Sequence, residues 1–167
     1  MLAETLEPTP APGPERAHGV VPRSVLTAGS GLAFLQGLID GVHPPPPFSR
    51  ATLIYLTSVA EGRAVFTGVP SEAFLNPIGT VHGGFAGLLL DSCMGAAVHT
   101  TCAEGEAYST LETKFNLVRA ITPEAGEVLA EGRVVHRGRR VATAEGHVRR
   151  ASDGKLLAHG TSTCMIL

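Results

Sequence analysis

The sequence predicts an α+β fold in which one antiparallel sheet wraps around a single long helix. The predicted elements run in the order short helix, two strands, long apolar helix, four strands. Because strands and helices do not alternate as they do in β-α-β units, a parallel sheet is disfavoured. The long helix is apolar on nearly every face, so a curled sheet would cover most of it.

Composition favours one soluble domain that associates with copies of itself. The 167 residues suit a single sizeable core, and the net charge of −2 gives no general affinity for nucleic acid or an anionic membrane. No apolar run approaches the roughly 20 residues that span a bilayer. Hydrophobic residues make up 44% against 17% charged, an excess that indicates a subunit interface. We therefore expect a homo-oligomer with no nucleic-acid or membrane partner.

The N-terminal segment, residues 1–27, is rich in Pro, Ala and Glu and is predicted to be a mobile tail before one domain over residues 28–167. Residues 1–22 lack the apolar core of a secretory signal. The three cysteines are odd in number and form no CxxC, which argues against a disulfide framework or a zinc cluster. A reducing, cytoplasmic setting is expected.

The elements before the long helix are short and have clear boundary signals. Residues 30–41 predict a helix that Ser30 caps and Gly41 ends. The proline run at 44–47 predicts extended chain, because each proline disfavours helical geometry in the residue before it. Residues 51–70 predict two strands joined by a tight turn.

The second half of the chain predicts the central helix and the rest of the sheet. The helix is expected from about residue 83 to 102. Turn signals rich in Gly, Pro and Asp then separate four strand-like segments, 107–118, 127–137, 140–150 and 155–166.

A lone carboxylate, Asp91, interrupts the apolar run of residues 76–99. If it were buried without a partner, it would cost several kcal/mol or shift its pKa, so we expect it to be functional. Gly84 and Gly87 share its helix face, and each interior glycine costs about 0.5–1 kcal/mol relative to alanine. We therefore expect another backbone or a narrow ligand to pack there.

The start of this helix is a second candidate for chemistry. The N–H groups of Gly83 and Gly84 have no partner within the helix and could polarise a carbonyl. Losing one such donor typically costs roughly 3 kcal/mol of barrier. Asp91 lies about 12 Å further along the axis, too far to serve the same carbonyl. A symmetric dimer with antiparallel helices would bring one copy's helix start near the other's Asp91.

The stretch "NPIGTVHGG" and a Gly-rich helix with Asp nine positions after His82 resemble the hotdog-fold acyl-CoA thioesterases of the PaaI-like, phenylacetate-pathway type. Segments 109–123, 132–148 and 154–166 match the strands of that family, so the resemblance covers about residues 30–166. It implies a hotdog fold and hydrolysis of an acyl-CoA, with CoA as part of the substrate and no cofactor or metal. It also implies a homo-oligomer, a dimer or a homotetramer built as a dimer of dimers, with active sites at the dimer interface.

The resemblance implies roles for particular residues. Asp91 matches the catalytic carboxylate, either as nucleophile on the thioester or as general base for water. Gly83 matches the residue whose N–H polarises the thioester carbonyl. Asn76 matches the side chain that orients the thioester or the water from the partner subunit. His82 matches a position that fixes the loop or contacts the thioester.

Two further assignments carry alternatives. Thr110 matches a hydroxyl that holds the water, and Ser109 could take that place instead. Arg137, Arg139 and Arg140 form a basic hairpin that suits the phosphates of CoA, or that is simply solvated.

Competing functions remain open at this point. The chain could be a non-catalytic acyl-CoA-binding module, or a dehydratase of hydroxyacyl thioesters, which needs a His/Asp or His/Glu pair. Asp91 favours the hydrolase, because a binder gains nothing from an acid beside a thioester. For Phe34, Leu35, Pro47 and Phe48 we expect ordinary core packing, and lining of the acyl pocket is the alternative role.

Overall fold

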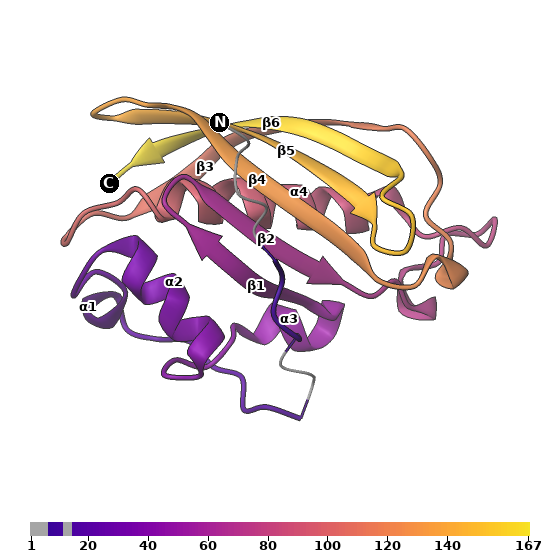
Figure 1. The fold of residues 1–167 in the computed structure, drawn as a ribbon, viewed down its shortest axis with the longest axis horizontal. Helices are drawn as coiled ribbons and strands as arrows, with labels where there is room; N and C mark the ends of the chain where they lie inside the picture. The colour runs from indigo at the N-terminus through magenta and orange to yellow at the C-terminus, as the bar shows by residue number, and fades with distance from the viewer. Residues whose placement is uncertain (1–6, 12–14) are drawn as a thin grey trace.

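A computed structural model describes residues 7–11 and 15–167, and in this part of the chain one antiparallel sheet curls around a central helix (Figure 1). The strand order β1-β2-β4-β5-β6-β3 makes β1 and β3 the two edges. The predicted α+β architecture is confirmed. The helices are α1 (Arg23–Leu26), α2 (Gly31–Asp40), α3 (Pro47–Thr52) and α4 (Gly83–His99), with 3₁₀ turns η1 (Glu72–Phe74) and η2 (Pro123–Ala125). The strands are β1 (Ile54–Ala60), β2 (Arg63–Gly68), β3 (Tyr108–Leu117), β4 (Val128–Arg137), β5 (Val141–Arg150) and β6 (Leu156–Ile166).

Helix α2 begins and ends as its sequence predicts. The Ser30 hydroxyl accepts a hydrogen bond from the Ala33 N–H at 3.2 Å, which satisfies one of the free donors of the first turn. Gly41 follows in the left-handed region with φ of 87°, where a residue without Cβ is strongly preferred.

Helix α3 corrects the prediction of extended chain and strand over residues 47–52, whereas residues 44–46 precede the helix and Pro46 is extended as predicted. Pro47 occupies the first helical position, where the missing N–H removes no hydrogen bond. The helix ends at Leu53, whose φ of 55° turns the chain into β1. The proline run is therefore extended only until it reaches the helix.

The predicted mobile tail, residues 1–27, is only partly described. Residues 1–6 and 12–14 lie outside the described residues. The remainder follows a defined path: Arg23–Leu26 form α1, and the Gly19 N–H donates to the Pro45 carbonyl at 3.0 Å. Sequence composition did not predict these contacts.

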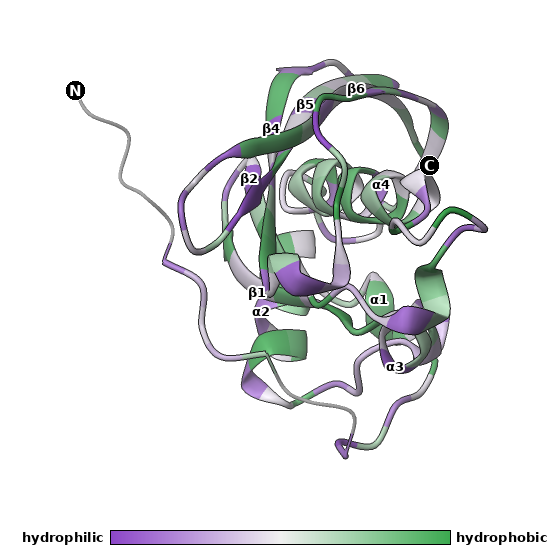
Figure 2. Ribbon diagram, turned by 90° about the vertical axis from the view of Figure 1, so that its right-hand side faces the viewer, coloured by the Kyte–Doolittle hydropathy of each residue, from purple (hydrophilic) through white to green (hydrophobic). Residues whose placement is uncertain are grey.

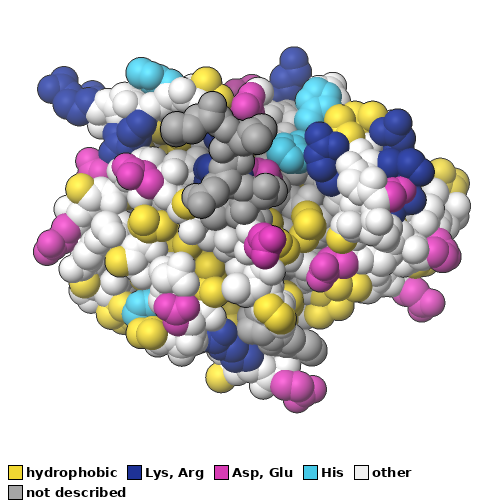
Figure 3. Space-filling model, in the orientation of Figure 1, with side chains coloured by type: hydrophobic (Ala, Val, Ile, Leu, Met, Phe, Trp, Pro, Cys, Tyr) yellow, Lys and Arg dark blue, Asp and Glu magenta, His cyan; other side chains and the backbone are white. Residues whose placement is uncertain are grey.

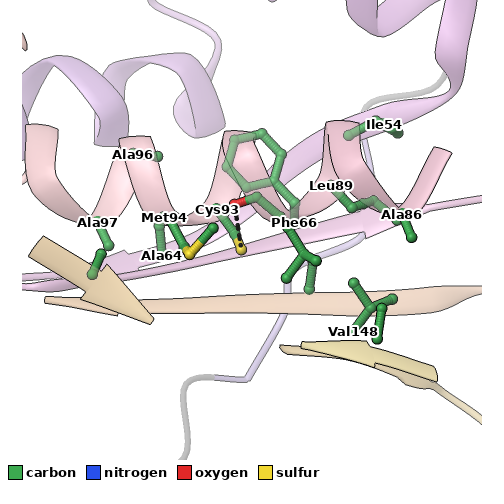
Figure 4. Close-up of a cluster of buried hydrophobic side chains, with 14 of the residues drawn as sticks. Ile54, Ala64, Phe66, Ala86, Leu89, Cys93, Met94, Ala96, Ala97 and Val148 are labelled. Atoms are coloured by element: carbon green, nitrogen blue, oxygen red, sulfur yellow. Dashed lines mark hydrogen bonds between the residues drawn. The ribbon is translucent and has the colours of Figure 1, made fainter. Parts of the chain in front are cut away.

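The core lies between α4 and the concave face of the sheet, as Figure 2 shows in a view close to the helix axis. Phe66 of β2, Val148 of β5 and Leu89 of α4 lie in one buried cluster (Figure 4). A Cβ on Gly132 of β4 would lie only 2.2 Å from the carbonyl oxygen of Cys93, so strand and helix backbones are in direct contact there. Among the described helices, none has the length and hydrophobicity to cross a membrane.

The two edges of the sheet differ. The edge strand β1 receives the Thr9 N–H, which donates to the Thr57 carbonyl at 3.1 Å. The edge strand β3 pairs with β6 along one side and has a bulge between Thr110 and Glu112. A bulge places two residues opposite one, so it changes which residues face the helix.

Candidate active site

The side of α4 that faces β3 is built from small residues. A Cβ on Gly87 would lie 3.0 Å from the ring of Phe115, and one on Gly95 would lie 2.7 Å from the hydroxyl of Tyr108. Close packing by the side chains of β3 therefore explains Gly87 and Gly95, in place of the second backbone or the narrow ligand that the sequence predicted. Asp91 lies in the same row, one helical turn from each of these glycines.

Asp91 is exposed in the single chain, which corrects the expectation of a buried carboxylate. Side chains of β3 cover the neighbouring Gly87 and Gly95 but leave the Asp91 carboxylate exposed, and Leu88 is also 40% exposed. One Asp91 carboxylate oxygen accepts a hydrogen bond from the Thr113 hydroxyl at 3.0 Å. Thr113 holds the carboxylate from β3 and leaves its other lone pairs available.

The start of α4 presents a free amide. The Nδ1 atom of His82, the N-cap residue, accepts from the Gly84 N–H at 2.9 Å, so the remaining ring proton is on Nε2 when the ring is neutral. Within the described residues the Gly83 N–H has no acceptor. Gly83 opens into a cavity of about 240 Å³, the helix-start cavity, lined by Asn76, Thr80, Val81, His82, Gly83, Ala86 and residues 117–121.

The Asn76 side chain shapes the loop before α4. Its Oδ1 accepts from the N–H groups of Ile78 and Thr80, at 3.1 and 3.2 Å. Its Nδ2 donates to the Thr80 hydroxyl at 2.8 Å, which uses one of the two amide hydrogens. Asn76 therefore lines the helix-start cavity with one hydrogen available, and its predicted contact with a thioester stays a prediction.

The structure brings Thr113, rather than Thr110, to Asp91 within the chain. Thr110 lies opposite Cys164 in β6, and its side chain hydrogen-bonds the Cys164 thiol. The bulge after Thr110 shifts the alternation of β3, so Thr113 faces the helix. Sequence reasoning missed Thr113 because a bulge leaves no local signal. A role for Thr110 or Ser109 at the site stays a prediction.

Arg119 is a second residue that sequence reasoning missed. It follows β3, lines the helix-start cavity and donates from Nη1 to the Leu156 carbonyl at 2.7 Å. Leu156 is the strand partner of Arg149, so Arg119 adjoins the β5–β6 turn. Figure 3 shows Lys and Arg side chains gathered on the right of the view, at this end of the molecule. Asp and Glu side chains lie at the same end, where Asp153 pairs with Arg150 and Lys155.

The predicted basic hairpin between β4 and β5 lies near the other end of α4 (Figure 1). Arg137 is already engaged there, because its Nη2 donates to Glu106 at 2.8 Å. Arg139 and Arg140 are exposed, and their binding of phosphates stays a prediction. Among the described side chains, no three of His, Cys, Asp or Glu are grouped so that they could hold a metal ion.

A separate apolar cavity of about 180 Å³ lies between α4 and the elements α2, α3 and β1. Ser92, the residue after Asp91, forms part of its wall, so the cavity reaches α4 beside the carboxylate. Of the four residues considered for an acyl pocket, Leu35 and Phe48 line this cavity, whereas Phe34 and Pro47 do not. Its other lining residues are Leu38, Pro45, Pro46, Ser49, Tyr55, Leu56, Phe66, Ala96 and Tyr108.

Comparison with known proteins agrees with this geometry. Residues 78–157 match the family model of the thioesterase superfamily. A phenylacetic acid degradation-related protein from Ralstonia eutropha has a TM-score of 0.71 and 30% identity, covering 79% of this chain and 98% of that one. A variant of the phenylacetic acid degradation protein PaaI from Thermus thermophilus has a TM-score of 0.63 and 32% identity, covering 71% of this chain and 97% of that one.

A thioesterase from Haemophilus influenzae shares the fold, with a TM-score of 0.69 and 20% identity over 80% of this chain and 90% of that one. No curated protein matches the sequence. The chain belongs to the thioesterase superfamily and has its hotdog fold. Thioester hydrolysis is accordingly the general class of its reaction.

Proposed function

We propose that the protein hydrolyses an acyl-CoA to the free acid and CoA at a site shared by two copies of the chain. One observation carries the proposal: α4 has a free Gly83 N–H at its start and an exposed Asp91 carboxylate further along. They are eight positions apart, which is about 12 Å along a helix. One chain cannot offer both groups to one carbonyl, whereas two antiparallel copies of α4 can.

The uncovered edge of the sheet supports this assembly. Large apolar side chains are exposed along β3, including Leu111 at 58% and Leu117 at 55%. An exposed edge strand with such side chains favours pairing with another strand. Two copies paired through β3 about a two-fold axis would form one continuous sheet with antiparallel α4 helices on one face. We propose a cytoplasmic dimer or dimer of dimers.

The chemistry then needs only these groups. The second copy's Gly83 N–H hydrogen-bonds the thioester oxygen and stabilises the oxyanion that forms on attack. Asp91 either removes a proton from the attacking water or attacks the carbonyl itself to give an anhydride that water opens. In both routes the C–S bond breaks and the CoA thiolate leaves and takes a proton. Thr113 orients the carboxylate through its hydrogen bond.

The acyl group is proposed to occupy the apolar cavity. Its volume of about 180 Å³ is comparable with an engineered apolar cavity of about 150 Å³ that binds benzene. A phenyl-sized tail would therefore fill it. Two similar proteins are named for phenylacetic acid degradation, which also favours a tail of this size.

The test is complementation between two inactive variants. Asp91→Asn removes the carboxylate charge, and Gly83→Pro removes the N–H donor at the helix position where proline is best tolerated. The proline ring would displace only the exposed end of Leu117. Each variant alone should lose at least a hundredfold in kcat, measured as thiol release from an acyl-CoA panel. Refolded as an equal mixture, they should regain about a quarter of the wild-type activity, because half of the dimers contain one intact site.

The controls separate the competing explanations. Refolding Asp91→Asn with itself should restore nothing. A mixture that stays inactive while mixed dimers are detected would show that Gly83 and Asp91 serve the same site within one chain. Wild-type protein that binds acyl-CoA and releases no thiol from any panel member would instead establish the non-catalytic binding module.

A further inference from the structure

A second apolar hollow, which we call the outer hollow, adjoins the apolar cavity. It has a volume of about 200 Å³, and the N-terminal residues Gly19, Val20 and Val21 form one of its sides. Leu38 of α2 and Pro46 line both the cavity and the hollow. These two side chains therefore form the partition between the two spaces.

The N-terminal segment that borders the outer hollow is held in place by direct contacts. The Gly19 N–H donates to the Pro45 carbonyl at 3.0 Å. The neighbouring His18 ring nitrogen lies 3.4 Å from the hydroxyl of Tyr55, which is itself a wall residue of the apolar cavity. The segment thus contacts residues of both spaces, with Val20 and Val21 at the hollow and His18 at Tyr55 of the cavity.

The two residues of the partition, Pro46 and Leu38, differ in what their substitution would do. Pro46 is the N-cap of α3, and its ring fixes the backbone there. Leu38 is half-buried on α2 and contributes only its side chain to the partition. Shortening Leu38 would join the two spaces, because nothing else that lines both has a removable side chain.

We propose that Leu38 limits the length of the acyl tail and that the outer hollow is a latent extension of the acyl site for longer chains. This rests on the proposed acyl-CoA hydrolysis. In the wild type, the apolar cavity accepts a tail about the size of a benzene ring, or roughly six carbons beyond the thioester carbonyl. With the partition removed, the outer hollow of about 200 Å³ accepts roughly as many carbons again.

The test is the chain-length profile of kcat/KM on straight-chain acyl-CoA substrates. Wild-type activity should fall steeply beyond the short tails. Leu38→Ala should extend the profile by several carbons. The ratio of kcat/KM for long substrates to kcat/KM for short ones should be at least tenfold higher than in wild type. Leu38→Phe should shift the preference to shorter acyl chains. This variant keeps the test valid if the alanine variant fails to fold.

Two controls make the proposal specific. Leu32→Ala changes the same residue type on the same helix at a position that lines neither space, and it should keep the wild-type profile. Val21→Trp fills the outer hollow, so it should leave wild type unchanged and cancel the extension in the Leu38→Ala background. Folded Leu38 variants that cleave short substrates with an unchanged profile would overturn the proposal. A wild type inactive on every substrate would overturn the proposed function instead.

Discussion

At the scale of single residues, the site depends on polar groups whose hydrogen-bonding capacity the protein does not fully use. Asp91 has one hydrogen bond from the protein, and the Gly83 N–H has none within the described chain. Donors and acceptors at this exposed face of α4 need not be satisfied internally, because water or a substrate can reach them. An exposed carboxylate with one fixed hydrogen bond is oriented and still accessible, as a nucleophile or base must be.

Thr113 should matter for catalysis more than Thr110. Thr113→Val removes the 3.0 Å hydrogen bond to Asp91 and should lower kcat about tenfold, since such a bond contributes about 1.5 kcal/mol. Thr110→Val is the matched control and should leave kcat within about twofold, because its hydroxyl bonds Cys164. The measurement is steady-state thiol release. A larger loss for Thr110→Val would return that residue to the role implied by the family resemblance.

Arg119 should contribute to recognition of the CoA phosphates. Arg119→Gln keeps a hydrogen-bonding side chain without the charge and should raise KM for acyl-CoA about tenfold, the effect of losing one charge-assisted bond. KM for the matching acyl-pantetheine, which has no nucleotide, should not change. Arg139→Gln/Arg140→Gln provides the comparison at the other end of α4. An effect confined to that double variant would assign the phosphates to the basic hairpin.

At the scale of elements, the position of α4 is set by contacts between backbones. Gly132 lets β4 lie directly against α4, and the glycines of α4 let the side chains of β3 lie close to the helix. The Asp91 carboxylate is placed beside Thr113 only because helix and strand meet at this separation. The small residues thus position the site although they take no part in the chemistry.

Gly132→Ala should destabilise the protein strongly. Its Cβ would lie 2.2 Å from the Cys93 carbonyl oxygen, and neither backbone can move without disturbing the core. We expect a loss of about 3 kcal/mol in the free energy of unfolding, measured by urea denaturation. Gly29→Ala is the control, since its Cβ would meet no atom within 4 Å, and its effect should stay within about 0.5 kcal/mol. Equal effects of the two substitutions would contradict this account of the α4–β4 contact.

At the scale of the whole molecule, acid stability should depend on His99. The ring is 5% exposed between Phe34 and Tyr108, and its Nε2 has no partner in the described structure. Burial lowers the pKa of His99 to about 4, so the unfolded chain takes up the proton first as the pH falls. Protonation of this group therefore costs no stability above about pH 6.5. Below that, stability is lost progressively down to about pH 4, by roughly 3 kcal/mol in total.

His99→Phe should abolish that acid-side loss. At pH 7 the variant should unfold at the same or a higher urea concentration, because an unpaired buried nitrogen is replaced by carbon. Between pH 6.5 and 4 its stability should fall less steeply than that of wild type. If the free energies of unfolding of the two proteins fall in parallel between pH 6.5 and 4, groups other than His99 govern acid unfolding.

Much of the architecture could be predicted from the sequence because its signals are local. The boundaries of α2 follow from Ser30 and Gly41, and the last four strands follow from alternation between turn residues. Helix α3 was missed because the proline at its first position, Pro47, continues a run of prolines and cannot be told from the extended prolines before it. Candidate site residues were found where a motif specifies them, as for Gly83 and Asp91, whereas Thr113 and Arg119 belong to no motif in the sequence.

The sequence by itself determined the order of α2, α4 and the six strands, the helix that carries the carboxylate, and the family. Only the tertiary structure decided that Asp91 is exposed, that Thr113 faces it, and that Leu38 separates two apolar spaces. Caps and periodicity act over a few neighbouring residues, so they can be read along the chain. Exposure, the register around a bulge and cavities depend on which distant segments meet, and no local pattern encodes that.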